Sequence, residues 1–372
     1  MKIRALLAVA LLAPACTGPS PAPGVATQPA FAASQVASTP EPSAPTTDAR
    51  GVEVALMDRS RKPGEDFYEY ANGTWLRTVE IPEDRPATGA FVRMDEEVLK
   101  RTRAILEDAA RSGAAPGTPG QRMGDVYASF MDEAAIEANG IRPLKPALDR
   151  IAKLKDKRAL SKELGAQLRT DVDALNLAHF HTSRLFGLWV EQDLNDPSRA
   201  TVYVLQGGLG MPDRSYYVDS GERMDRARAK YQEYLAQLMK LVGIKDAGKK
   251  AGRVLELEKK IAAAHRSRQE SFEVAKCNNP WSRTAFAEKA PGLDWDLAFQ
   301  AANLDKLAEL IVWQPSAVTG IAALVKSEPL DVWKDYLAVR AIDRAAPFLP
   351  KAFADAHFAM YGTTLRGTPK AR

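Results

Sequence analysis

Apolar residues recur along most of the chain at the spacing of α-helices that have one apolar face. Val126, Tyr127, Phe130 and Met131 follow Met123 at i+3, i+4, i+7 and i+8, which predicts a helix with one buried side. Stripes of this kind are far more often protein core than cofactor sites. The same interpretation applies to the stripes at Val98–Leu106 on a helix that begins near Arg93, Leu160–Leu168, Tyr231–Val242, Val254–Ile261 and Leu330–Leu337.

A predicted β-hairpin interrupts the helical pattern in the middle of the chain. Gly187–Val190 and Thr201–Leu205 read as strands, and the turn-forming segment Asn195–Ser198 lies between them, as expected of two antiparallel strands. Ser112–Gly120 (SGAAPGTPG) ends one predicted helix before the next begins. The sequence therefore predicts a mainly α fold, a multi-helix lobe with a small β-hairpin insertion.

The first fifteen residues have the pattern of a secretory signal peptide. Lys2 and Arg4 supply a positive start, Ala5–Ala13 is apolar, and Ala13–Ala15 (APA) is a small-residue cleavage site. The apolar stretch rises only about 14 Å as a helix, against about 30 Å of bilayer hydrocarbon. The sequence therefore predicts export of the protein and not a permanent membrane span.

Residues 16–57 are predicted to form a disordered linker, because proline, alanine, serine and threonine dominate the segment and few bulky residues are present. Cys16 follows Pro14 and Ala15 directly, as in a bacterial lipoprotein signal, although Leu12 stands four places before it where three is usual. Cys16 is therefore the candidate lipid attachment residue. Two locations remain open: a periplasmic or outer-membrane lipoprotein that contacts the membrane only through this anchor, or a secreted protein.

Composition and charge exclude several classes of partner. The chain is 45% hydrophobic and 26% charged, and 51 Lys and Arg against 47 Asp and Glu leave a net charge of +4, so we expect no nucleic-acid partner. Cys16 and Cys277 are the two cysteines. If Cys16 belongs to a processing signal, an internal disulfide framework is excluded.

The search for catalytic residues is negative. A zinc peptidase helix needs two histidines four residues apart with a glutamate between them, whereas the four histidines here are His179, His181, His265 and His357. No Gly-x-Ser-x-Gly motif occurs, and Cys277 has no nearby histidine or Cys-x-x-Cys partner. We therefore expect no catalytic and no metal-ligating residue in this chain.

Two glycine-containing segments resemble phosphate or dinucleotide motifs only superficially. Gly243–Lys250 ends in lysine where a phosphate-binding loop needs a hydroxyl, and it joins two predicted helices. Gly207–Gly210 lacks the third glycine of a dinucleotide fingerprint. We interpret the first as a solvated connector and the second as a tight turn.

Several segments together resemble the N-terminal region of the neprilysin and endothelin-converting-enzyme family of zinc metalloendopeptidases, which includes the bacterial oligopeptidase O type. Pro63–Leu76 (PGEDFYEYANGTWL) resembles the opening signature of that family, and Gln206–Tyr217 (QGGLGMPDRSYY) resembles its Gly-Leu-Gly-Leu-Pro-Asp-Arg-x-Tyr-Tyr loop. Further matching segments follow in the family's order: Ala290–Trp295, Trp333–Leu337, Phe348–Phe353 and Phe358–Gly362.

The resemblance implies a division of the chain and a zinc cofactor outside it. Residues 93–372 would form a helical cover lobe that admits peptides, and residues 58–92 would pack on a catalytic lobe, with Phe67, Tyr68 and Trp75 facing that lobe. Members of the family continue into a catalytic region that carries the His-Glu-x-x-His helix, and zinc belongs to that full-length enzyme. One local departure is Phe272–Asn279, where the family commonly reads Arg-Asp-Pro-Val-Lys-x-Tyr-Asn.

Two functions remain open from the sequence. In the first, the chain is the N-terminal portion of an exported zinc metalloendopeptidase and is inactive alone because it lacks the zinc site. In the second, it is a stand-alone, non-catalytic exported module that binds peptides or a separately encoded catalytic chain.

Overall fold

The computed structural model describes residues 52–170 and 182–371. The chain divides into two compact units, residues 1–79 and 80–372, and each is described by itself. The signal peptide, most of the predicted linker, Cys16, His179 and His181 lie outside the described residues. The predicted division of the chain into residues 1–15, 16–57, 58–92 and 93–372 stays a prediction.

Over its described residues, 52–79, the first unit contains a 3₁₀ turn, η1 (Val54–Leu56), and one helix, α1 (Phe67–Thr78). The Asp66 side chain caps α1 by accepting a hydrogen bond from the Glu69 backbone N–H. The buried carboxylate of Asp58 accepts from Arg77, with 2.7 Å between Nη1 and Oδ2. Of the aromatic residues in the family-like signature, Phe67 and Tyr68 are exposed, whereas Trp75 is half-buried.

The second unit begins with a pair of packed helices, α2 (Ala90–Arg111) and α3 (Pro119–Met131). Gly124 lets them approach closely, because a Cβ there would lie 2.6 Å from the Ala109 carbonyl oxygen. Both helices were predicted, and α2 begins three residues before the expected Arg93. The prediction that α3 has a buried side is wrong: Val126 and Phe130 are 68% and 51% exposed. The periodicity identified the apolar face, but the described residues cover it only in part: Tyr127 is half-buried, and Phe130 meets Phe348 with 6.0 Å between ring centroids.

Four short strands form one sheet in the order β1-β2-β4-β3. The hairpin of β1 (Phe186–Gln192) and β2 (Ala200–Gln206) confirms the prediction, with Trp189 opposite Tyr203. Strand β4 (Glu309–Val312) pairs parallel with β2, and β3 (Asn279–Ser282) pairs antiparallel with β4. The hairpin is therefore half of a four-stranded sheet, which the sequence did not indicate.

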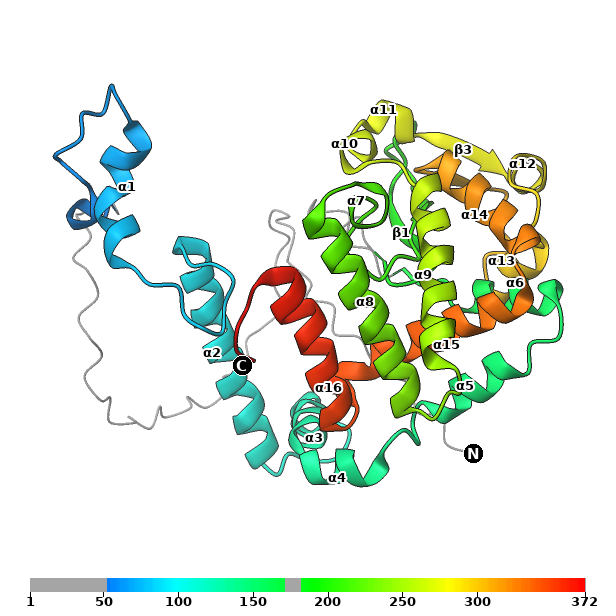
Figure 1. Cartoon of the computed structure of the whole chain (residues 1–372), viewed down its shortest axis with the longest axis horizontal. Helices are drawn as coiled ribbons and strands as arrows, with labels where there is room; N and C mark the ends of the chain where they lie inside the picture. The colour runs from blue at the N-terminus through cyan, green and yellow to red at the C-terminus, as the bar shows by residue number, and fades with distance from the viewer. Residues whose placement is uncertain (1–51, 171–181, 372) are drawn as a thin grey trace, which may run out of the picture. The chain divides into compact units, whose positions relative to one another are not determined.

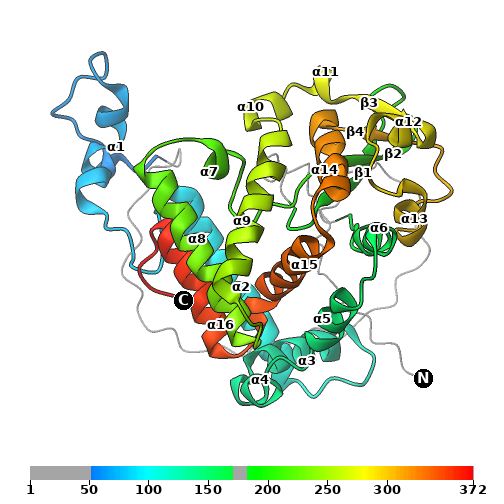
Figure 2. The same cartoon turned by 45° about the vertical axis from the view of Figure 1, so that its right-hand side comes forward.

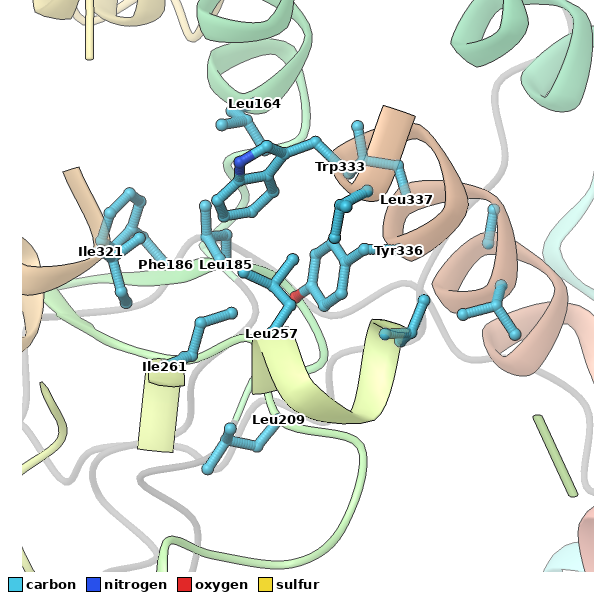
Figure 3. Packing of buried hydrophobic residues seen from close by; sticks show 14 of the residues in the cluster. Leu164, Leu185, Phe186, Leu209, Leu257, Ile261, Ile321, Trp333, Tyr336 and Leu337 are labelled. Carbon is cyan, nitrogen blue, oxygen red and sulfur yellow. The ribbon is translucent and has the colours of Figure 1, made fainter. Parts of the chain in front are cut away.

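Helix α9 (Ala247–Ala264) is central to the main core. It packs against α8 (Glu222–Leu241), α14 (Pro315–Ser327) and α15 (Leu330–Ala345), and it lies between α8 and α14 in both views (Figures 1 and 2). The predicted apolar stripes of α8, α9 and α15 are buried, as Figure 3 shows for Leu257, Ile261 and Trp333. The remaining helices are α4 (Glu133–Asn139), α5 (Lys145–Ala152), α6 (Lys157–Ala166), α7 (Ser215–Val218), α10 (Arg268–Ser271), α11 (Val274–Cys277), α12 (Arg283–Lys289), α13 (Trp295–Ala301), η2 (Ala346–Phe348), α16 (Lys351–His357) and the π-helical segment η3 (Phe358–Thr364).

A second, smaller apolar cluster involves the sheet. Trp189 and Tyr203 stack with 4.5 Å between ring centroids, and Trp313 meets Trp189 edge-on at 5.1 Å. Cys277 belongs to this cluster and is fully buried; burial raises the pKa of its thiol. This environment suits a packed side chain and not a reactive thiolate.

Within the described part of the chain, no helix is both long enough and apolar enough to cross a bilayer.

Candidate functional site

A pocket of about 850 Å³ opens beside the glycine-rich loop that follows β2. Three stretches distant in sequence form its walls. They are the loop itself at Gln206–Ser215, the segment Arg266–Phe272 around α10, and Tyr361 and Arg366 near the C-terminal end. These stretches are far apart in the sequence. The packing of α8, α9 and α15 in the main core brings them together in the folded chain.

Buried side chains hold the backbone carbonyls of the loop one after another. Nε2 of His265 lies 2.9 Å from the Gly207 oxygen, and the Tyr336 hydroxyl donates to the Gly208 oxygen at 2.9 Å. Arg340 then donates from Nη2 to the Leu209 oxygen at 3.2 Å. A loop whose backbone groups are individually satisfied by buried partners is fixed in one conformation.

The loop's N–H groups converge on a single hydroxyl. Both Gly210 and Met211 donate their backbone N–H to Tyr217 Oη, at 3.0 and 2.8 Å. The Tyr217 hydroxyl in turn donates to Oε2 of Glu258 at 2.6 Å. Glu258 is fully buried on α9, so the loop is tied to the centre of the helical core.

Glycine is required at three positions of this loop. A Cβ on Gly207 would lie 2.3 Å from the Arg184 carbonyl oxygen. Gly208 has φ of 91°, in the region that residues with a Cβ rarely adopt. A Cβ on Gly210 would overlap the Tyr231 hydroxyl and lie 2.6 Å from Nη1 of Arg340. Gly208 has the left-handed backbone that a tight turn would use, but no backbone hydrogen bond closes a turn within Gly207–Gly210. The glycines instead bring the backbone against a buried polar network.

That network lies directly behind the loop and joins α8, α9 and α15. Tyr231 donates to Oε1 of Glu258 at 3.1 Å, and Tyr234 donates to Oδ1 of Asp343 at 2.6 Å. Arg340, only 2% exposed, donates from Nη1 to Oδ2 of Asp343 at 2.7 Å. Buried ions are tolerated only when paired and hydrogen-bonded. Arg340 meets this through its two Nη atoms, whereas its Nε is buried without a partner.

Electrostatics keep Arg340 charged and the tyrosines neutral. Burial opposes the charge of Arg340, but Asp343 and Glu258 outweigh that effect and raise the pKa of the guanidinium. Burial, reinforced by Glu258, raises the pKa of Tyr217 and Tyr231 well above its ordinary value. Neither hydroxyl is therefore poised to give up a proton, and the network supports the pocket wall without providing an acid or base.

Glu258 makes the stability of this region depend on pH. Burial raises the pKa of its carboxyl above the ordinary 4.5, although Arg340 acts in the opposite direction. The folded state then binds the proton more tightly than the unfolded state, so this contribution to stability is fully present below pH 4.5 and is lost as pH rises through the folded pKa.

We expect the free energy of unfolding of the wild type, relative to Glu258→Gln, to fall as pH rises above 4.5. Urea unfolding of both proteins at a series of pH values measures the difference. Glu222→Gln, at an exposed position of α8, is the control and should show no comparable trend. A difference that is independent of pH for Glu258→Gln would contradict the assignment.

The described histidines have structural surroundings. His265 is buried and bonded to the loop, and His357 packs against Tyr361 with 4.6 Å between ring centroids. Among residues 52–170 and 182–371, no group of three or more His, Cys, Asp or Glu side chains lies close enough together to hold a metal ion.

Sequence reasoning missed the polar network and the pocket. Glu258 and Arg340 are single charged residues within helices, and such residues are usually solvated. A signal was present: Glu258 adjoins Leu257 of the apolar stripe and follows Val254 by four residues, and Arg340 follows Tyr336 by four. Both therefore lie on helix faces that the pattern itself predicts to be buried.

Fold and site together define a mainly helical protein with a pocket supported by a buried polar network. Residues 63–372 match the model of peptidase family M13, and the chain belongs to this family. The resemblance seen in the signature segments is thereby confirmed.

Two solved structures of the zinc metalloprotease Zmp1 from Mycobacterium tuberculosis are similar to this chain. The crystal structure of the inhibitor complex is 32% identical with a TM-score of 0.78, and it covers 86% of this chain and 48% of Zmp1. The structure of the open state is 33% identical with a TM-score of 0.69, and the match covers 84% of this chain and 47% of Zmp1. Human endothelin-converting enzyme-like 1 is 26% identical over 82% of this chain and 40% of its own length. The chain thus spans less than half the length of these relatives.

Proposed function

We propose that this chain acts in proteolysis as the helical, peptide-handling region of a zinc metallopeptidase. The match to family M13 over residues 63–372 carries the proposal, and similarity to the zinc metalloprotease Zmp1 supports it. The pocket beside the glycine-rich loop has the size and fixed walls of a ligand site, and we assign it to binding a part of the peptide.

The residues described here do not fit a zinc site, so we assign zinc no ligand among them. His265 is bonded to a backbone carbonyl and His357 is packed among aromatic rings, which leaves neither free to coordinate. We propose that the chain alone does not cleave peptides, and that in the working enzyme this region binds and encloses the peptide while zinc ligands come from residues outside those described.

The exposed apolar face of α2 and α3 supports a docking role for this region. Phe91, Val98 and Ile105 are 82%, 61% and 59% exposed along α2, and the apolar face of α3 adds Val126 and Phe130. Large exposed apolar side chains that gather on neighbouring helices often mark a protein contact. We propose that this face packs on the catalytic region that the longer relatives carry, whether the same chain or a separate one supplies it.

Export is the remaining part of the proposal and rests on Met1–Ala15 and Cys16. Cleavage at Ala15 with lipid on Cys16 would anchor the protein, and cleavage without lipid would secrete it. Mass spectrometry of the mature N-terminus distinguishes the two.

The proposal is tested with the purified chain. We expect less than stoichiometric zinc by elemental analysis and no hydrolysis of quenched fluorogenic peptides, because no described residues form a metal site. The same peptides should nevertheless bind, as measured by fluorescence anisotropy. Cleavage that a chelator abolishes would contradict the assigned lack of activity, and failure to bind any peptide would contradict the peptide-handling role.

A further inference from the structure

The pocket beside the glycine-rich loop carries an excess of positive charge. Its lining includes four arginines, Arg214, Arg266, Arg268 and Arg366, but two carboxylates, Asp213 and Asp219. We propose that this pocket binds acidic side chains of a peptide, so that the protein prefers peptides that carry glutamate or aspartate. The inference rests on the proposed function and names the class of peptide that this site takes.

The nearby carboxylates are largely engaged with other groups. Oδ1 of Asp213 accepts from the Ser215 N–H at 2.7 Å and from its hydroxyl at 2.5 Å. Glu270, at α10, accepts through Oε2 from the Ser267 N–H at 2.8 Å and its hydroxyl at 2.7 Å. These oxygens are tied to the turns that shape the pocket, so the guanidinium groups are not neutralised by close ion pairs.

Arg214 contributes a buried donor that lacks an acceptor. Its Nε is buried and has no hydrogen-bond partner in the structure. The charge of Arg214 helps to lower the pKa of Glu270, after the larger effects of Ser267 and Arg266, but no ion pair within 4.0 Å joins Arg214 and Glu270. A buried N–H without an acceptor is unfavourable, and among the described residues no ion pair neutralises the charge of Arg214 where it lines the pocket.

Arg268 and Arg366 stand exposed at the rim, from two separate parts of the chain. Arg268 lies over the Phe272 ring, 6.0 Å from its centroid, and neither arginine forms an ion pair with the described residues. The planar guanidinium group presents two parallel N–H donors to a carboxylate. The rim is therefore suited to attract acidic groups, and the fixed loop beneath it needs no reordering when they bind.

A second hollow of the same lobe provides a contrast. Its volume is about 460 Å³ and it is lined by Arg158 and Arg283 with three aspartates. Arg158 lies 3.5 Å from Asp294, and Arg283 lies 2.5 Å from Asp296. Its aspartates outnumber its arginines and pair with them, and so it offers no site for an anion but a good position for control substitutions.

The test uses the purified full chain and two fluorescein-labelled peptides. One carries two adjacent glutamates, and its twin has glutamines at those positions. By fluorescence anisotropy we expect the glutamate peptide to bind about tenfold more tightly at low salt, and salt to reduce the preference. The double variant Arg268→Gln with Arg366→Gln should reduce the preference for the glutamate peptide from about tenfold to about twofold.

The control double variant is Arg158→Gln with Arg226→Gln, which removes the same charge at positions outside the pocket. It should keep the tenfold preference, and circular dichroism should show both double variants folded. Equal binding of the two peptides to the wild type would overturn this inference and leave the peptide-handling role standing, whereas no binding of either would overturn both. Inorganic phosphate that binds as tightly as the glutamate peptide would make the pocket a simple anion site and would also overturn the inference.

Discussion

Replacing Arg340 with methionine is expected to lower the free energy of unfolding by about 3–5 kcal/mol at neutral pH. Arg340 is 2% exposed, and its Nη1 donates to Asp343 at 2.7 Å. Methionine fills similar space but leaves Asp343 buried without its cation and raises the cost of a charge on Glu258. The substitution also removes the hydrogen bond to the Leu209 oxygen, so the glycine-rich loop loses one of its supports.

Urea unfolding monitored by tryptophan fluorescence measures this change. Arg226→Met, at an exposed position on α8, is the matched control and should stay within about 0.5 kcal/mol of the wild type. The double variant Arg340→Met with Asp343→Leu should lose less than the two single losses added together, because the two charges disappear together. If Arg340→Met cost no more than the surface control, the network would not support the loop.

The second large effect is expected at Trp333, whose replacement by alanine should cost about 3–5 kcal/mol. The side chain is completely buried on α15, and Figure 3 shows its indole in the part of the core that contains Leu164, Leu185 and Leu337. Removing the indole leaves a cavity that rigidly packed helices can fill only in part.

Thermal or urea unfolding would measure the loss, and Trp333→Phe should lose clearly less because the phenyl ring refills much of the space. The weak hydrogen bond from Nε1 to the Leu324 oxygen, at 3.4 Å, contributes little to the difference. Equal losses for alanine and phenylalanine would show that the hydrogen bond, and not the packed volume, carries the effect.

The long helices were predictable from sequence because their apolar residues repeat with the period of the helix itself. Tyr231 to Val242 and Val254 to Ile261 lie on α8 and α9 with their stripes in the core, as expected. The same reasoning failed on the burial of Val126, because periodicity identifies an apolar face but does not say whether another part of the protein covers it. Strands β3 and β4 have four residues each, too few to show a period.

The site was less predictable, since it depends on convergence and not on a local motif. The glycines of Gly207–Gly210 marked this segment in the sequence. Arg214, Arg268 and Arg366, in contrast, are spread over more than a hundred residues and meet only in the folded chain. No pairwise spacing in the sequence marks them. The family resemblance located the loop without indicating which charges surround it.

The side chains that hydrogen-bond to the glycine-rich loop are synthesised long after the loop itself. Tyr336, which bonds to the Gly208 oxygen, comes 128 residues after it. Arg340 follows Leu209 by 131 residues, and Tyr361 follows Gly210 by 151. Closing such long stretches costs conformational entropy before any contact repays it. The glycine-rich segment is therefore synthesised early but reaches its final shape only after the residues up to Tyr361 have been synthesised.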